Sequence, residues 1–144
     1  MILFRNGHAF SWAARCCPPH PHCTPFVSVE IAAGSGIFAP VIGKVDTGAF
    51  RTMLDFATAA ALGLDPSTWD PNAPSGTACS ATGQAIPYYE HRILVRIVNA
   101  AGLPFFFPLR VAFAQQICRN LFGIDWLDHL CLAVDRQSVY FLAD

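Results

Sequence analysis

Charge is scarce in this 144-residue sequence, and no stretch of it stays apolar for long without interruption. Charged residues make up 13% of the chain and the net charge is −1 at pH 7, so there is no basic field to attract nucleic acid or an anionic membrane. The best candidate for a membrane span, residues 100–114, is broken by Pro104, Pro108 and Arg110. We therefore expect neither nucleic-acid binding nor a membrane span.

The N-terminus lacks the uninterrupted apolar core of a secretory signal, because the polar segment Arg5–His8 divides its apolar residues. Without export, cysteines stay reduced, so we expect a cytoplasmic protein with free thiols rather than disulfides. Cys131 lies in an apolar run and is predicted to be a small core residue. The six cysteines are Cys16, Cys17, Cys23, Cys79, Cys118 and Cys131.

Apolar residues are abundant, at 53% of the chain. A length of 144 residues is typical of one domain with a real core, and the apolar excess indicates further surface to bury. We expect a second copy of the chain to cover part of that surface.

Residues 1–24 differ in character from the rest. The segment Cys16–Cys23 holds three prolines, which fix φ and remove hydrogen-bond donors, so regular structure is not expected there. We predict a loosely ordered N-terminal extension at 1–24, followed by one domain at 25–144. A soft-metal site in the extension is the alternative, but adjacent cysteines in a proline-stiffened loop do not match the usual zinc spacings. The prediction is therefore no metal and no cofactor.

From Phe26 onward the pattern is that of short strands separated by turns. Asp55 begins a predicted helix at 55–62 that Gly63 ends, and Asp125 is expected to cap a second short helix at 125–130. Many short strands with two brief helices predict an all-β, barrel-like domain. The predicted strands cover residues 26–31, 37–45, 76–80, 84–98, 109–113, 130–135 and 138–142, and those at 76–80 and 84–98 form a hairpin around 81–83.

One tripeptide, Asp46-Thr47-Gly48, follows an apolar strand and precedes Ala49. Asp-Thr-Gly arises by chance and suits ordinary turns, so a purely structural Asp46 is the plain alternative. The tripeptide occurs once in the chain. Whether Asp46 has more than a structural role therefore depends on the other motifs in the sequence.

Three blocks follow one another along the chain. They are Val45–Ala49 with Thr52 and Leu54, the hairpin from Gly83 through Ile86–Tyr89 to Ile93–Val95, and Asn120–Gly123 with Asp125–Leu127. Together they resemble the retropepsin-like (retroviral-type) aspartic protease family over residues 26–142. The resemblance implies a closed, barrel-like acid-protease fold that functions as a homodimer and needs no cofactor.

The same resemblance assigns roles to individual residues, with Asp46 as the catalytic residue. Thr47 would hydrogen-bond across a twofold axis, and Gly48 would allow a turn that a Cβ obstructs while placing its N–H near the carboxylate. Support of the active-site loop is implied for Thr47, Gly48, Ala49, Leu121, Phe122 and Gly123. Substrate contact is implied for Ala81, Thr82 and Gly83 on the flap-like hairpin, and for Phe50 and Arg51 at the border of the groove.

Two positions depart from the family's pattern, Phe50 and Ile124. Relatives often carry a polar residue at the first and an arginine at the second, and the two can form an ion pair. Both are apolar in this chain, so we expect a packed contact in place of the ion pair.

Hydrolysis of a peptide without a metal or a covalent nucleophile needs one group to activate water and another to protonate the leaving nitrogen. Two carboxylates that share one proton do both. Since this chain has one such Asp, the second must come from another copy. The sequence therefore predicts an aspartic endopeptidase that cleaves extended peptides or proteins between two Asp46 side chains. A catalytically inactive retropepsin-like domain, used for dimerisation or peptide binding, is the alternative.

A Cys–His protease is a further alternative, with Cys79 or Cys118 as the nucleophile and His91 or His129 as the base. No nucleophile signature surrounds either cysteine. The two histidines are expected to be surface or packed residues.

Overall fold

Strands make up most of the computed structural model, which describes residues 8–13, 15–16, 23–24, 26–98, 102–134 and 138–143. Side chains are described for residues 26–98 and 102–131. Across these parts of the chain, no helix is long and apolar enough to cross a membrane. Residues 99–101 and 135–137, which include the end of the strand predicted at 130–135, lie outside the described residues.

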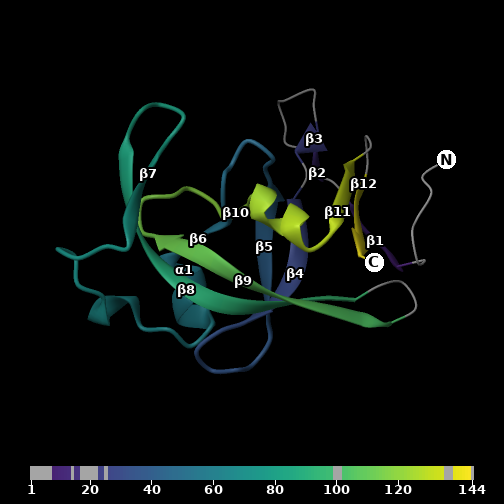
Figure 1. Cartoon of the computed structure of the whole chain (residues 1–144), viewed down its shortest axis with the longest axis horizontal. Coiled ribbons are helices and arrows are strands. Elements are labelled where there is room, and N and C mark those ends of the chain that lie inside the picture. Colours follow the sequence, from purple (N-terminus) through teal and green to yellow (C-terminus); the bar gives the residue numbers. More distant parts are fainter. Residues whose placement is uncertain are drawn as a thin grey trace.

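Six strands close into a barrel. In order around it they are β4 (Phe26–Ala32), β5 (Ala39–Val45), β10 (Leu121–Phe122), β6 (Met53–Asp55), β9 (Pro104–Ala114) and β8 (Ala85–Val98). A pairing of β4 with β8, in which Glu30 lies opposite Arg96, joins the two ends of this order. The strand β7 (Gly76–Cys79) extends the sheet beyond β8 and forms the hairpin at the upper left of Figure 1. The predicted all-β, barrel-like domain is confirmed.

An ion pair reinforces the seam at which the barrel closes. The Nε of Arg96 donates to one carboxylate oxygen of Glu30 at 2.7 Å, and its Nη2 donates to the other at 2.8 Å. The same guanidinium lies 4.3 Å from the ring centre of Phe38. Two parallel hydrogen bonds fix the register of the strands as well as adding stability.

Alternation along the strands fills the barrel interior. In β4, Val27, Val29 and Ile31 are buried while the residues between them are at least partly exposed, as expected of a strand with one face on the core. The largest fully buried side chains are aromatic or aliphatic: Phe107, Phe113, Phe122, Ile31, Leu54, Leu62, Ile97, Val95 and Val111.

The short strand β10 brings the first and third predicted blocks together. Phe122 pairs with Val45 in a parallel ladder, and Leu121 pairs with Lys44 on one side and Met53 on the other. Neighbouring parallel strands end at the same edge of a sheet. The loops that begin after Val45 and Phe122 therefore leave the sheet side by side.

The predicted helix at 55–62 is observed as α1 (Phe56–Ala61). Asp55 is its N-cap and accepts a hydrogen bond from the Thr58 N–H at 2.6 Å. Gly63 has a φ of 80°, the left-handed conformation in which helices commonly end. A 3₁₀-helix, η1 (Pro66–Thr68), follows and was not predicted.

The second predicted helix is a 3₁₀-helix, η2 (Ile124–Asp128). The predicted cap at Asp125 is wrong. Gly123 occupies the N-cap position without any side-chain cap bond, and the Asp125 carboxylate is bonded to Thr52 instead. A long-range contact therefore takes precedence over the local capping role.

A second, three-stranded sheet includes part of the predicted N-terminal extension. β1 (His8–Ala13) pairs with β12 (Ser138–Ala143), which pairs in turn with β11 (Cys131–Val134). These strands lie together on the right of Figure 1, away from the β7–β8 hairpin. The division of the chain into an extension at 1–24 and a domain at 25–144 stays a prediction.

The expectation that Cys16–Cys23 avoids regular structure is wrong at both ends of that segment. β2 (Arg15–Cys16) pairs with β3 (Cys23–Thr24) in a short antiparallel ladder. Residues 17–22 lie outside the described residues. Two strands of two residues each need few backbone bonds, so prolines between them do not prevent this pairing.

The predicted core position of Cys131 is also wrong, because its side chain is exposed. Its strand, β11, belongs to the three-stranded sheet rather than to the barrel, whereas the adjacent Leu130 is buried in the core. The three cysteines with described side chains, Cys79, Cys118 and Cys131, are free, as predicted.

The ring of Phe122 lies against the backbone of Gly43. A Cβ at position 43 would come within 2.7 to 2.9 Å of ring atoms that are themselves buried. We expect Gly43→Ala to lower the free energy of unfolding by about 1–3 kcal/mol in denaturant titrations, because the ring must shift within a packed core. The double variant Gly43→Ala/Phe122→Leu should lose less than the sum of the single losses, since leucine vacates the ring positions. Additive losses would contradict this account.

Candidate active site

Asp46 directly follows β5, and several hydrogen bonds fix its position. Its N–H donates to the carbonyl of Phe122 at 2.9 Å, and its own carbonyl accepts from the Ala49 N–H at 3.0 Å. The Gly48 N–H donates to Oδ1 at 3.0 Å, and Nζ of Lys44 lies 3.3 Å from Oδ2. Each carboxylate oxygen therefore has a donor, while 30% of the side chain stays exposed.

The reason for a glycine at position 48 differs from the expected one. The described glycines with positive φ are at 36, 63, 83 and 102, and Gly48 is not among them. A Cβ on Gly48 would meet one atom within 4 Å, the Oδ1 of Asp46 at 3.2 Å. The missing side chain thus makes room for the carboxylate rather than for a turn, and the expected N–H contact is present.

Gly123 lets the second loop lie directly on the first. A Cβ at this position would come within 2.6 Å of the Arg51 carbonyl oxygen and 2.8 Å of the Ala49 carbonyl oxygen. The Ile124 N–H donates to the same Ala49 carbonyl at 3.0 Å. The packed contact expected between Phe50 and Ile124 is wrong, because the Phe50 side chain is 82% exposed. Backbone contact joins the loops here.

A fully buried threonine, to which no role was predicted, forms the main link between the two loops. The Thr52 hydroxyl accepts from the Gly123 N–H at 3.1 Å and from the Trp126 indole N–H at 2.9 Å. It donates to the Asp125 carboxylate at 2.8 Å, and the Thr52 N–H donates to the other oxygen at 2.8 Å. The hydroxyl thus uses its single donor and both acceptor positions.

Burial raises the pKa of Asp125 above its ordinary value. The hydrogen bonds from Thr52 and the positive charge of Arg51 oppose this shift without cancelling it. The Asp125 carboxylate is therefore partly buried, next to Ile124 in sequence, and accepts two hydrogen bonds from Thr52 there.

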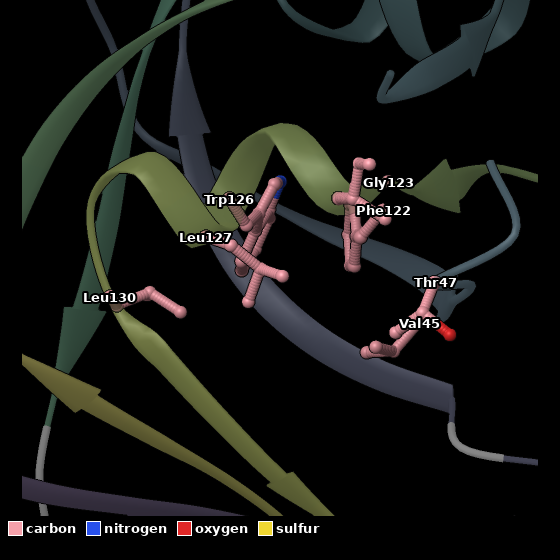
Figure 2. A pocket seen from close by; sticks show the side chains of 8 residues that line it. Val45, Thr47, Phe122, Gly123, Trp126, Leu127 and Leu130 are labelled. Carbon is pink, nitrogen blue, oxygen red and sulfur yellow. The ribbon is translucent and has the colours of Figure 1, made fainter. Parts of the chain in front are cut away.

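A small apolar depression lies behind the Asp46 loop (Figure 2). In Figure 2, Val45 and Thr47 stand on one side of it and Phe122 and Trp126 on another. Phe122 stacks on Trp126 with ring centres 4.7 Å apart. The lining residues are Val45, Thr47, Phe122, Gly123, Ile124, Trp126, Leu127 and Leu130. Phe122 and Gly123 thus lie behind the loop, and their role in supporting it stays a prediction.

A groove of about 820 Å³ passes in front of the same loop. Asp46, Gly48 and Ala49 line it from the loop, and the β7–β8 hairpin contributes the opposing wall. Of the predicted contact residues, Phe50, Arg51, Ala81 and Thr82 line the groove. Leu121, to which support of the loop was assigned, lines it too. Gly83, in the hairpin turn with a φ of 82°, is not among the described lining residues.

Arg51 is held at the border of the groove by its neighbours. Its guanidinium pairs with Glu90 and lies 5.3 Å from the ring centre of Tyr88. The hydrogen bond from Arg51 lowers the pKa of Glu90, and the same bond raises the pKa of Arg51. The charge of Arg51 is therefore balanced within the chain, and Arg110 lies 3.6 Å from the second Glu90 oxygen.

Each candidate histidine packs against an aromatic ring, as predicted. His91 stacks on Trp69 at 4.8 Å and burial lowers its pKa, while His129 stacks on Phe107 at 5.0 Å. Both candidate cysteines line the groove, but neither histidine does, so a Cys–His pair has no geometric support. Within the described ranges, no group of three or more His, Cys, Asp or Glu residues could hold a metal ion.

Neither a protein-family model nor a curated protein matches the sequence. Among solved structures, the chain is similar to a retropepsin-like aspartic protease from Rickettsia conorii, with a TM-score of 0.62 and 16% identity over 92% of this chain and 90% of that one. It is also similar to the retroviral protease-like domain of Ddi1 from Leishmania major, with a TM-score of 0.40 and 22% identity over 81% of this chain and 94% of that one. The first similarity shows a retropepsin-like fold, in agreement with the motif resemblance.

Thr52→Val should destabilise the protein, because valine has the shape of threonine but no hydroxyl. The change leaves the Gly123 N–H, the Trp126 indole N–H and a carboxylate oxygen without their partner. We expect a loss of about 2–4 kcal/mol in the free energy of unfolding. The control Thr77→Val, at an exposed position of β7, should change it by less than about 0.5 kcal/mol. Equal losses in the two variants would contradict the assigned role.

Asp125 should make stability depend on pH. Its pKa is raised in the native state, so its contribution is greatest when the carboxyl is protonated and is lost as pH rises through the raised pKa. The unfolding free energy of the wild type minus that of Asp125→Asn should therefore decrease as pH rises from about 4. Glu30 and Glu90 are present in both proteins, so their opposite shifts cancel in the difference. A difference that stays constant or increases would refute the assignment.

Proposed function

On this retropepsin-like fold, we propose an aspartic endopeptidase whose catalytic residue is Asp46. The observation that carries the proposal is a partly exposed carboxylate, held by donors on both oxygens, in a groove walled by a β-hairpin. Its oxygens are held by Gly48 and Lys44, so the carboxylate is oriented before any substrate arrives.

The second carboxylate would come from Asp46 of a second copy. A twofold axis through the Asp46 loops would bring the two side chains together and complete a site that one copy lacks. Thr47 and Leu127 are exposed near the depression behind the loop, and Phe50 is exposed just beyond Ala49. Such uncovered groups around the loop favour a partner on this face.

In the proposed reaction, the two Asp46 carboxyls share one proton. The ionised one takes a proton from a water molecule as the water oxygen attacks the peptide carbonyl carbon. The protonated one gives its proton to the carbonyl oxygen, so that a gem-diol forms. The first carboxyl then gives the proton it took from water to the leaving nitrogen as the C–N bond breaks. The second takes back a proton from a hydroxyl of the gem-diol, which restores the shared proton and leaves a carboxylic acid as product. The titration behaviour belongs to the pair of carboxyls rather than to either residue.

The hairpin would act as the flap over an extended peptide. Ala81 and Thr82 line the groove from its tip, and Gln84 is bonded to Gln116 on the far side at 3.3 Å. A hydrogen bond between two exposed side chains contributes little net stability, so the hairpin could open and close with substrate. Phe50 and Arg51 would contact the peptide along the border of the groove.

A catalytically inactive domain that binds peptides or dimerises is the second candidate. The contact between Lys44 and Asp46 favours it, since an ammonium group beside the carboxylate competes with the second carboxylate and with water for the same oxygen. The two candidates share the groove and the dimer and differ in cleavage.

The Asp46→Asn variant tests the endopeptidase. We expect it to remain dimeric by analytical ultracentrifugation and to cleave unstructured protein substrates at least about a hundredfold more slowly than the wild type, because it cannot accept the proton of water. A statine-type peptide, which mimics the tetrahedral intermediate, should inhibit the wild type. The control Asp128→Asn, at an exposed position of η2 outside the groove, should cleave normally.

Two results would count against the enzyme. Undiminished cleavage by a dimeric Asp46→Asn protein would remove Asp46 from catalysis. Absence of cleavage by a verified wild-type dimer, from mildly acidic to neutral pH, would favour the binding domain.

A further inference from the structure

Lys44 lies on the floor of the groove. Along β5, Val41, Gly43 and Val45 are buried, so Lys44 belongs to the opposite, outward face. Asp46 is two residues further on, and side chains at i and i+2 of an extended chain point the same way. Both residues line the groove, and the Lys44 Nζ lies 3.3 Å from Oδ2 of Asp46.

The groove carries more positive than negative charge. Among its described lining residues are three cations, Lys44, Arg51 and Arg119, and one carboxylate, Asp46. Glu90 already balances Arg51. Arg119 is exposed and its guanidinium lies 5.8 Å from the ring centre of Phe26, whereas Lys44 contacts the carboxylate directly.

The proposed dimer leaves this charge uncompensated. Two Lys44 side chains bring two positive charges to the centre, whereas two Asp46 carboxyls that share a proton bring one negative charge. One ammonium is therefore without a full counter-charge at the point where the peptide is cut. Lys44 is also 32% exposed and uses one of its three donors on Asp46, which leaves donors for a ligand.

We infer that Lys44 makes the groove select peptides with Asp or Glu beside the bond that is cleaved. The inference rests on the proposed function, because the water-activating carboxylate fixes where that bond must lie. A residue flanking the bond is then within reach of Nζ, and its carboxylate accepts a charge-assisted hydrogen bond from the ammonium. Gln or Asn at the same substrate position has nearly the same shape as Glu or Asp but carries no charge.

A purely positioning role for Lys44 makes a different prediction. If the ammonium served only to orient Asp46, its removal would slow cleavage of all substrates to the same extent. A selecting role changes the ratio between matched substrates. The ratio is thus the measurement that separates the two roles.

The experiment compares two peptides that differ only in Glu or Gln beside the cleaved bond. We expect the wild type to have a roughly five- to tenfold higher kcat/KM for the Glu peptide, a preference that weakens as salt is added. Lys44→Met keeps much of the stem but not the charge, and should bring the ratio close to one. The control Arg92→Met removes one positive charge at an exposed position of β8 outside the groove, and should leave the ratio unchanged.

A binding arm separates failure of this inference from failure of the proposed enzyme. Asp46→Asn and Asp46→Asn/Lys44→Met are titrated with the same peptides by calorimetry. Tighter binding of the Glu peptide by the first protein and equal binding by the second would support the selection even without cleavage. Cleavage with no Glu preference would overturn the inference and leave the enzyme standing. Equal or undetectable binding of both peptides by Asp46→Asn would also overturn it.

Discussion

The hydroxyl group of Thr52 joins two loops whose hydrogen-bonding residues lie 71 to 74 positions apart in the sequence. It is fully buried and satisfies the N–H of Gly123, the indole of Trp126 and the carboxylate of Asp125 at once. A buried polar group without a hydrogen-bond partner lowers the stability of the fold. Thr52 and its three partners therefore stabilise one arrangement of the two loops. The position of Asp46 depends on this arrangement, because its own N–H is bonded to the residue just before Gly123.

The groove side of the loop is less constrained than the side that faces the core. Behind the loop, Phe122 and Trp126 stack and Gly123 touches the backbone of Ala49 and Arg51. In front, Asp46 is partly exposed. The side of the loop that faces the core is packed and the side that faces the groove is open. This arrangement would suit a catalytic carboxylate, which must keep its orientation while different substrates bind. In the proposed enzyme, the charged groups in front, Lys44 above all, would then determine which peptides are favoured.

Much of the fold could be predicted, because its signals are local. Asp55 followed by alanines and Gly63 predicts α1, and the tip at 81–83 predicts the β7–β8 hairpin; both are observed. The closed barrel and the retropepsin-like fold agree with the resemblance that the Asp46 motif suggested. Local patterns predicted these elements, although they missed η1 and the short pairing of β2 with β3.

The errors that concern the candidate site arise where distant segments meet. Asp125 has the pattern of a helix cap, but Thr52 takes its carboxylate, and no spacing in the sequence relates two residues 73 positions apart. Phe50 and Ile124 were expected to pack, yet backbone contacts join the loops and Phe50 is exposed. The alternation of β5 does place Lys44 and Asp46 on one face, but only the groove shows that this face meets the hairpin.

The central claim is that two Asp46 side chains form one site, and activity in mixed dimers tests it most directly. Wild-type and Asp46→Asn chains are exchanged at increasing ratios and the rate of peptide cleavage is measured at constant total protein. A shared site makes every mixed dimer inactive, so an equal mixture should retain roughly one quarter of the activity. Roughly one half would mean that each copy works alone, and would contradict the account.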